Sequence, residues 1–283
     1  MIDLHLHVLP DLDDGASSLR ESRVMLERLG SLGFNRIVST PHLMERLTRD
    51  YHHRATAALD VVRPIAAEYG LSLDLGYEHL LVPDLVERLK IGEPSTLAGS
   101  SAVLVELPFI GWPRHADASL FDLQSAGYRP ILAHPERYTD VQQNPEIALA
   151  AADRGIILQL TSSSFAGVYG KTAERTARTI LSQGLERGAV FVLSTDAHSA
   201  GQRLAKVADG HAWIRKNIRQ GSAVVDWAAR ATATAILQDI APASFQSWSL
   251  QSAERVAIPQ PAELPAVRRE GGLRRILTRS KGL

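Results

Sequence analysis

The stretch Asp3-Leu4-His5-Leu6-His7, close to the N-terminus, decides how the rest of the chain is interpreted. Aliphatic and polar residues alternate at every second position, which is the period of a β-strand. A strand would place both imidazoles on one face, where histidines at positions i and i+2 can reach a single metal ion. The same pattern also fits two polar side chains on a half-exposed strand, so the choice depends on the residues that follow.

Apolar segments typical of strands recur along the chain and alternate about seven times with helical segments. They lie at residues 36–40, 71–77, 102–105, 130–133, 156–160 and 189–193. Most are followed closely by a side chain that can bind a metal: His42, Glu78, Glu106, His134, Asp196 and His198. Each of these alone has a structural alternative, such as a turn cap or an ion pair. Because the carboxyl ends of strands converge on one face of a (β/α) barrel, the repeated placement predicts a barrel with its active site there.

The composition is that of an ordinary soluble protein. The 283 residues are 45% hydrophobic, and the formal net charge is zero, so no overall field attracts nucleic acid. The chain has no cysteine, which excludes disulfides, thiolate metal sites and a cysteine nucleophile. No apolar run approaches a membrane span and no signal segment precedes the first strand, so we expect a cytoplasmic protein.

The candidate ligands mix imidazoles and carboxylates, a combination that suits manganese, zinc or iron. With His5, His7 and an aspartate of the acidic loop at residues 11–14, they are too many for one ion and fit a cluster of two or three. Such a cluster lowers the pKa of bound water and clamps the oxygens of a phosphoryl group. Arg137 and Arg203 each follow a candidate histidine by a few residues and could bind the phosphate, or form surface ion pairs instead.

Seven short motifs, taken in order, resemble the PHP (polymerase and histidinol phosphatase) superfamily. They are DLHLH at 3–7, DLDDG at 11–15, STPH at 39–42, GYE at 76–78, VEL at 105–107, AHPERY at 133–138 and STDAH at 194–198. More closely, they resemble the bacterial manganese-dependent protein-tyrosine phosphatases of capsular and exopolysaccharide operons. The likeness covers about residues 1–240, and the ordered set is specific although H-x-H alone is weak.

The resemblance implies a distorted (β/α)7 TIM-like barrel, the PHP fold, holding two or three divalent ions. Manganese is expected, with zinc or iron as alternatives. The ligand sets that the resemblance implies are His5, His7, Glu78 and Asp196 for one ion, Glu78, Glu106 and His134 for a second, and Asp14, His42 and His198 for a third. Arg137 and Arg203 would correspond to the phosphate-binding arginines of the family.

Two details of the implied site stay open. Asp11 and Asp13 lie beside Asp14, and the sequence does not decide which of the three aspartates binds metal. Residues 159–165 match a variable region that lines the pocket in the family, and Phe109 could line the same pocket or pack in the core.

The resemblance also implies partners. Members of the family oppose tyrosine autokinases that control polysaccharide chain length, and several form oligomers. We therefore expect a phosphotyrosine protein as substrate, in particular a bacterial tyrosine kinase of polysaccharide export, and we expect no nucleic acid; a homo-oligomer stays open. Hydrolysis would use metal-activated hydroxide, because a chain without cysteine cannot form a cysteinyl phosphoenzyme.

Three other functions fit parts of the pattern. A PHP-type histidinol phosphatase or another small-molecule phosphomonoesterase would use the same cluster, although DLDDG and AHPERY favour the tyrosine phosphatases. A nuclease-type PHP module would need a basic groove, which the neutral charge does not indicate. A catalytically silent binding module would have lost ligands, and here the full set is present.

The end of the chain departs from the shorter members of the family. We expect a phosphatase domain over residues 1–241 and a disordered extension over residues 242–283. Six basic residues and one acidic residue lie within residues 267–283. A helix from about Leu273 is the alternative, and its basic, apolar character would suit a membrane surface or an acidic partner.

Overall fold

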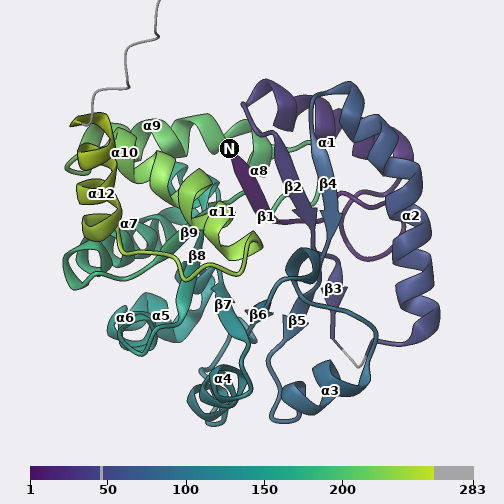
Figure 1. Ribbon diagram of the computed structural model, residues 1–283, viewed down its shortest axis with the longest axis horizontal. Helices are drawn as coiled ribbons and strands as arrows, with labels where there is room; N and C mark the ends of the chain where they lie inside the picture. The colour runs from purple at the N-terminus through teal and green to yellow at the C-terminus, as the bar shows by residue number, and fades with distance from the viewer. Residues whose placement is uncertain (45–46, 258–283) are drawn as a thin grey trace, which may run out of the picture.

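The computed structural model describes residues 1–44 and 47–257. Strands and helices alternate through most of this part of the chain (Figure 1). The strands are β1 (Ile2–Leu6), β2 (Arg36–Ser39), β3 (His42–Leu43), β4 (Ser72–Leu75), β5 (Glu78–Leu80), β6 (Ala102–Glu106), β7 (Arg129–Ala133), β8 (Ile157–Thr161) and β9 (Phe191–Ser194).

Helices cover the strands and connect most of them. The α-helices are α1 (Leu19–Ser31), α2 (Arg49–Glu68), α3 (Leu85–Ile91), α4 (Ala116–Ser125), α5 (Thr139–Gln143), α6 (Glu146–Asp153), α7 (Gly170–Arg187), α8 (Gln202–Ala205), α9 (Val207–Asn217), α10 (Gly221–Asp226), α11 (Thr232–Leu237) and α12 (Phe245–Ala257). Short 3-10 turns are η1 (Leu97–Gly99), η2 (Pro135–Arg137) and η3 (Ser162–Ala166), and η4 (Trp227–Ala231) is a π-helical turn. None of the described helices has the length and apolar character to cross a membrane.

All the strand pairs are parallel, and they form two sheets. The smaller sheet has the order β1-β2-β4, and the larger has the order β3-β5-β6-β7-β8-β9. A bridge between Leu6 and Ala197, just after β9, connects β1 to the larger sheet. The parallel α/β architecture is therefore as predicted. A single closed (β/α)7 barrel is not shown, because the described strands divide into two sheets (Figure 1).

The division arises because two segments predicted as single strands lie in the smaller sheet, whereas the residues that directly follow each of them pair in the larger sheet. Residues 36–40 and 71–77 run through the smaller sheet as β2 and β4, and the chain then enters the larger sheet as β3 and β5. Backbone hydrogen bonds keep the two segments together across the change, from Gly76 N to Ser39 O at 2.8 Å and from Glu78 N to Pro41 O at 3.2 Å. Gly76 permits this close packing, since a Cβ there would lie 2.7 Å from Leu97 Cδ2.

The sheets are buried and share a core. All five residues of β6 and of β8 are buried, as expected for parallel strands covered on both faces. Leu4 from the smaller sheet packs in one apolar cluster with Leu104 and Ile157 from the larger sheet. The two sheets therefore hold a fixed relation to each other, and the residues at their ends can form one site.

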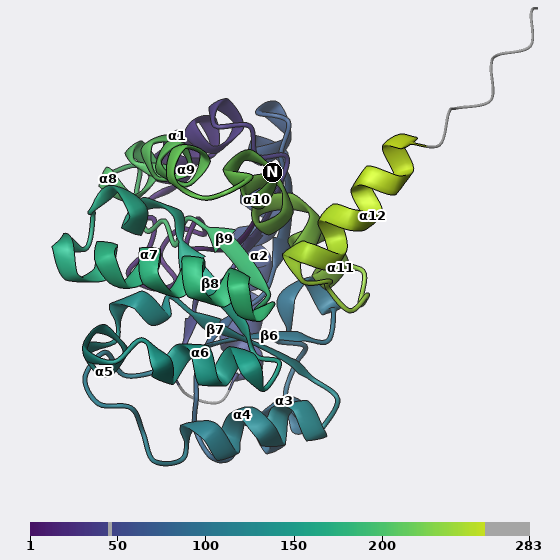
Figure 2. The same ribbon diagram turned by 90° about the vertical axis from the view of Figure 1, so that its left-hand side faces the viewer.

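The helix α12 corrects the prediction of a disordered segment after residue 241. Phe245 is only 8% exposed, and its ring lies 5.6 Å from that of Trp227. Trp227 Nε1 also donates to Ala243 O at 3.1 Å. Figure 2 shows α12 beside α11 at the edge of the molecule. Aromatic packing thus orders residues that composition alone placed in a tail; the expected basic segment and the helix from about Leu273 lie outside the described residues.

A buried histidine away from the strand ends makes stability depend on pH. His211 on α9 is 2% exposed, and its Nε2 lies 3.0 Å from Ser162 Oγ. Burial disfavours the charged imidazole and lowers the pKa of His211 from 6.5 to about 4. Between these two values the unfolded chain binds a proton that the folded protein does not bind. The contribution of His211 to stability is therefore complete above pH 6.5 and is lost as the pH falls toward 4.

We expect His211→Gln to flatten the acid side of the stability profile. From pH 7.5 to pH 5, the wild-type chain should lose about 2 kcal/mol more free energy of unfolding than the variant. Urea unfolding of both proteins at the two pH values measures the difference. Equal losses in the two proteins would contradict the assignment.

Candidate metal centre

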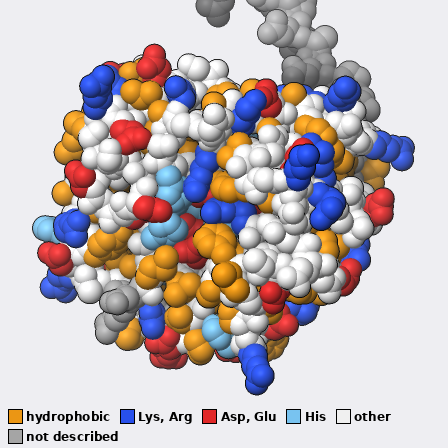
Figure 3. Space-filling view, turned by 180° about the vertical axis from the view of Figure 1, so that it is seen from behind, with side chains coloured by type: hydrophobic (Ala, Val, Ile, Leu, Met, Phe, Trp, Pro, Cys, Tyr) orange, Lys and Arg blue, Asp and Glu red, His pale blue; other side chains and the backbone are white. Residues whose placement is uncertain are grey.

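The predicted site residues converge on one cavity, close to the carboxyl ends of β1, β6, β7 and β9. The cavity has a volume of about 390 Å³, and its lining residues are Asp13, Asp14, His42, Met44, Glu106, Phe109, His134, Arg137, Asp196, His198 and Arg203. Figure 3 shows histidine side chains beside acidic and basic ones on this face, bordered by hydrophobic side chains. His5, His7 and Glu78 do not line the cavity but are buried against residues that do.

The possible ligand atoms form four overlapping groups, within each of which they lie no more than 4.8 Å apart. The groups are His7, Asp14, His42 and His198; His5, His7 and Asp196; His5, Glu78 and His134; and His42, Glu78 and Glu106. All nine predicted ligands are included. The grouping differs from the three expected sets. The Glu78, Glu106 and His134 set is divided, with Glu106 beside His42 and His134 beside His5, and His7 also joins the group of Asp14.

Glu78 is at the centre of the arrangement. One carboxylate oxygen, Oε2, lies 3.0 Å from His5 Nε2, 3.3 Å from His7 Nε2 and 3.1 Å from His42 Nδ1. The other, Oε1, lies 3.0 Å from His134 Nε2. A fully buried carboxylate surrounded by four imidazoles can bridge two cations.

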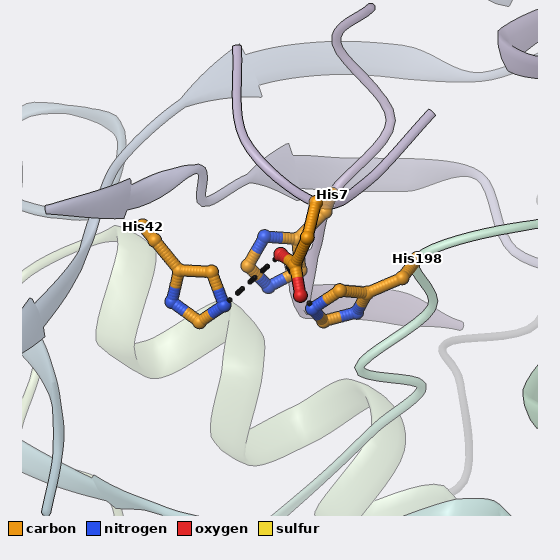
Figure 4. A group of neighbouring side chains, drawn as sticks. His7, His42 and His198 are labelled. Carbon is orange, nitrogen blue, oxygen red and sulfur yellow. Dashed lines mark ion pairs between the residues drawn. The ribbon is translucent and has the colours of Figure 1, made fainter. Parts of the chain in front are cut away.

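The acidic loop contributes Asp14 on the solvent side of the cluster. Asp14 Oδ1 lies 3.4 Å from His42 Nε2 and 3.4 Å from His198 Nε2, although 71% of the Asp14 side chain is exposed. Figure 4 shows the imidazoles of His7, His42 and His198 turned toward one another. Asp14 is therefore the aspartate of the loop that joins a ligand group.

Asp13 and Gln159 contact the Nδ1 atoms of two histidines of the cluster. Asp13 Oδ2 lies 2.6 Å from His7 Nδ1, and Gln159 Oε1 lies 2.9 Å from His5 Nδ1. Gln159 Oε1 also accepts from the backbone N–H of His134 at 3.1 Å. A hydrogen bond to one ring nitrogen leaves the other free to bind a metal and fixes the ring orientation.

Two site residues adopt the left-handed backbone conformation within two residues of a strand end. His134 has φ of 33° and Asp196 has φ of 49°. Such a conformation costs an L-residue other than glycine about 1–2 kcal/mol. Backbone strain of this kind collects at functional sites, where surrounding contacts maintain it.

Electrostatics keep the carboxylates of the cluster charged. Burial alone would raise the pKa of Glu78, but the neighbouring histidines lower it well below its usual value. Burial likewise opposes ionisation of Asp196, yet His5, His134, Arg137 and Arg203 lower the pKa of Asp196. Burial and the nearby His7 lower the pKa of His198 to about 2, so His198 stays neutral. Burial also opposes charge on His5, His7 and His42, but the neighbouring carboxylates outweigh it and raise their pKa values. A bound cation would displace protons from these three imidazoles. Ionised carboxylates and neutral imidazoles are the forms that bind metal.

The donor set fits divalent cations. Five buried atoms of the cluster make no well-directed hydrogen bond among the described residues, although ion-pair contacts inside the cluster reach four of them: His42 Nδ1, Glu78 Oε2, Glu106 Oε1 and Asp196 Oδ1, the fifth being His134 Nδ1. Buried polar atoms without partners are costly unless a ligand satisfies them. Imidazole and carboxylate groups together suit manganese, zinc and iron. These residues could hold more than one such ion.

Arg137 and Arg203 border the cavity, as predicted. Arg137 Nη1 lies 2.6 Å from Asp196 Oδ2, and Arg203 Nη1 lies 3.2 Å from Asp196 Oδ1. Their side chains are 15% and 25% exposed, so each retains access to the cavity. Two guanidiniums beside a cation cluster provide N–H donors for the oxygens of a phosphoryl group.

Comparison with known proteins agrees with this geometry. The family model for capsular polysaccharide synthesis, CpsB/CapC, matches residues 1–238. The chain belongs to this family. The tyrosine-protein phosphatase YwqE of Bacillus subtilis is 30% identical over 205 residues, which are 72% of this chain and 79% of YwqE. The tyrosine-protein phosphatase CpsB of Streptococcus pneumoniae is 30% identical over 210 residues, covering 72% and 85% of the two chains.

The fold comparison gives the same relatives. The crystal structures of YwqE from Bacillus subtilis and CpsB from Streptococcus pneumoniae, described as metal-dependent tyrosine phosphatases, include a chain that matches this one with a TM-score of 0.76. The match covers 85% of this chain and 95% of that chain, at 27% identity. Family membership and the recognition of metal-dependent tyrosine phosphatases from the motifs are thereby confirmed.

The sequence did not predict, or predicted only in part, the roles of three residues near the site. Asp13 is one of the three aspartates that the sequence left open as ligands, but it contacts His7 from the far side of the ring. Gln159 lies in the variable stretch, yet its role depends on His5 and His134, which are distant in sequence. Tyr169 was missed, because nothing in its local sequence distinguishes it from a core tyrosine.

Proposed function

We propose that this protein is a metal-dependent protein-tyrosine phosphatase. The observation that carries the proposal is the buried cluster of imidazole and carboxylate ligand atoms that meets a cavity bordered by two arginines. The named activity of the relatives supports the same conclusion. The metal ligands proposed are His5, His7, Asp14, His42, Glu78, Glu106, His134, Asp196 and His198, within a phosphatase domain over residues 1–241.

Different residues of the cavity would bind different parts of the substrate. Arg137 and Arg203 would donate hydrogen bonds to the phosphoryl oxygens. Phe109 is 43% exposed and stacks on His134 with ring centroids 5.7 Å apart, which leaves ring surface for a tyrosyl side chain. Bound divalent ions would lower the pKa of the attacking water and offset the negative charge that develops on phosphate.

We propose manganese as the metal and a phosphotyrosine protein as the substrate. The substrate would be a bacterial tyrosine kinase of polysaccharide export, and the reaction would take place in the cytoplasm. The family description, capsular polysaccharide synthesis, supports this choice of pathway. The ligand types themselves accept manganese, zinc or iron, so metal identity needs its own measurement.

The proposal predicts manganese-dependent phosphate release from a phosphotyrosyl peptide. The protein would be stripped with a chelator and assayed with and without added manganese, on that peptide and on histidinol phosphate. We expect release from the peptide only with metal. His5→Ala should abolish it, because His5 contributes to two of the ligand groups.

The other outcomes are equally informative. A preference for histidinol phosphate would replace the proposal with a small-molecule phosphatase that uses the same cluster. Release from neither substrate, with metal shown to be bound, would overturn the phosphatase assignment. Repeating the assay with zinc and iron tests the choice of manganese.

A further inference from the structure

The two arginines that border the cavity contact aromatic rings, and one of these rings, Tyr169, lies behind the residues that line the cavity. Arg137 Cζ lies 4.6 Å from the ring centroid of Phe109 and 4.4 Å from that of Tyr169. Arg203 Cζ lies 5.3 Å from the same Tyr169 ring. The ring of Tyr169 thus contacts both arginines within the range of cation–π attraction.

Tyr169 also has contacts besides those with the arginines. It directly precedes α7 and is only partly exposed. Its hydroxyl donates to Asp196 Oδ2 at 3.2 Å. The ring is therefore fixed at one end by the start of a long helix and at the other by a residue of the cluster.

We propose that Tyr169 is a positioning residue that sets the spacing of Arg137 and Arg203, so that both guanidiniums address one phosphoryl group. The inference rests on the proposed function and extends it to a residue that contacts neither the phosphate nor the metal. Tyr169 would act through the face of its ring, which attracts both guanidinium groups.

Asp196 also positions the two arginines, and its place in a ligand group explains why a second contact is needed. Both arginines pair with the Asp196 carboxylate, and Asp196 also groups with His5 and His7. A metal ion at that group would draw electron density from the same carboxylate and weaken its pull on the arginines. The Tyr169 ring is not a metal ligand, so its attraction for the two guanidiniums would persist.

The test varies the electron density on the face of the ring at position 169 while keeping the shape of the ring. Phenylalanine, monofluoro-phenylalanine and trifluoro-phenylalanine would be placed at position 169 in the full chain, since fluorine withdraws electron density from the face. The readout is the dissociation constant of inorganic phosphate, measured by calorimetry on manganese-loaded protein. We expect it to rise stepwise with fluorination, by about threefold to tenfold from phenylalanine to the trifluoro form.

Two further readouts separate positioning from a structural role. We expect KM for a phosphotyrosyl peptide to rise with the phosphate dissociation constant, while metal content and melting temperature stay constant across the series. Tyr169→Leu, which removes the ring, should weaken phosphate binding further than any fluorinated form. The matched control is Tyr128→Leu, a half-buried tyrosine just before β7, which should leave phosphate binding unchanged.

A flat dissociation constant across the fluorinated series would overturn the inference, as would a loss of metal in parallel with phosphate. Because the series keeps the aromatic shape, it tests the inference even where Tyr169→Leu does not fold. Phosphate binding needs no peptide turnover. Failure of the proposed function would instead appear in the wild-type protein, as metal-loaded chain that binds phosphate but releases none from the peptide.

Discussion

Glu78→Gln is expected to lose its metal and, with it, nearly all activity. The carboxylate of Glu78 lies within 3.3 Å of nitrogens from His5, His7, His42 and His134. Glutamine keeps the shape but removes the charge, and its amide nitrogen cannot bind a cation. Because even outer contacts change metal affinity 10- to 100-fold, a central ligand should change it by more than about 100-fold.

Metal analysis after dialysis and turnover of a phosphotyrosyl peptide would measure this effect, and circular dichroism would verify folding. The matched control is Asp74→Asn, which removes a carboxylate that pairs with Arg36 and belongs to none of the ligand groups. It should keep full metal content. Glu78→Gln with normal metal content and turnover would rule out Glu78 as a ligand.

Arg137→Gln is expected to lower kcat/KM for the peptide by about 10²–10³-fold, the usual effect of losing a preorganised charged donor. Arg137 lies between a carboxylate and two rings, with Nη1 2.6 Å from Asp196 Oδ2 and Cζ 4.4 Å from the Tyr169 ring. Arg137→Lys should recover only part of the loss. An ammonium keeps the charge but lacks the planar fork and the stacking surface.

Steady-state kinetics and inhibition by inorganic phosphate distinguish these variants. The control is Arg154→Gln, because Arg154 forms a surface pair with Asp117 in which both side chains are about half exposed. Surface pairs of this kind contribute little, so we expect kinetics equal to the wild type. An Arg137→Lys variant as active as the wild type would show that charge alone matters at this position.

The positions of most candidate ligands could be predicted because these residues follow apolar segments of the sequence. His134 after β7 and Asp196 after β9 were recognised this way, and the structure places both beside the cavity. Parallel strands make such a reading reliable, since their carboxyl ends meet at one edge. Only the structure shows that Asp14 joins a group of possible ligands, because three aspartates within four residues look alike in sequence.

Long-range geometry accounts for what the sequence could not predict. The passage of the chain from the smaller sheet into the larger one after residues 36–40 and 71–77 depends on contacts such as Gly76 against Leu97, which no local pattern encodes. The order of α12 depends on Phe245 meeting Trp227. Tyr169 acquires its position beside two arginines only through the packing of η3 and α7, so its local sequence carries no sign of it.

The division of the strands into two sheets has a consequence for cohesion. His5 and His7 end a strand of the smaller sheet, whereas Glu106 and His134 lie at the ends of strands of the larger sheet. The proposed ions would therefore cross-link two structural units in a chain that has no cysteine for a disulfide. Bound metal would then stabilise the contact between the two sheets. Its loss would destabilise that contact before it affects the interior of either sheet.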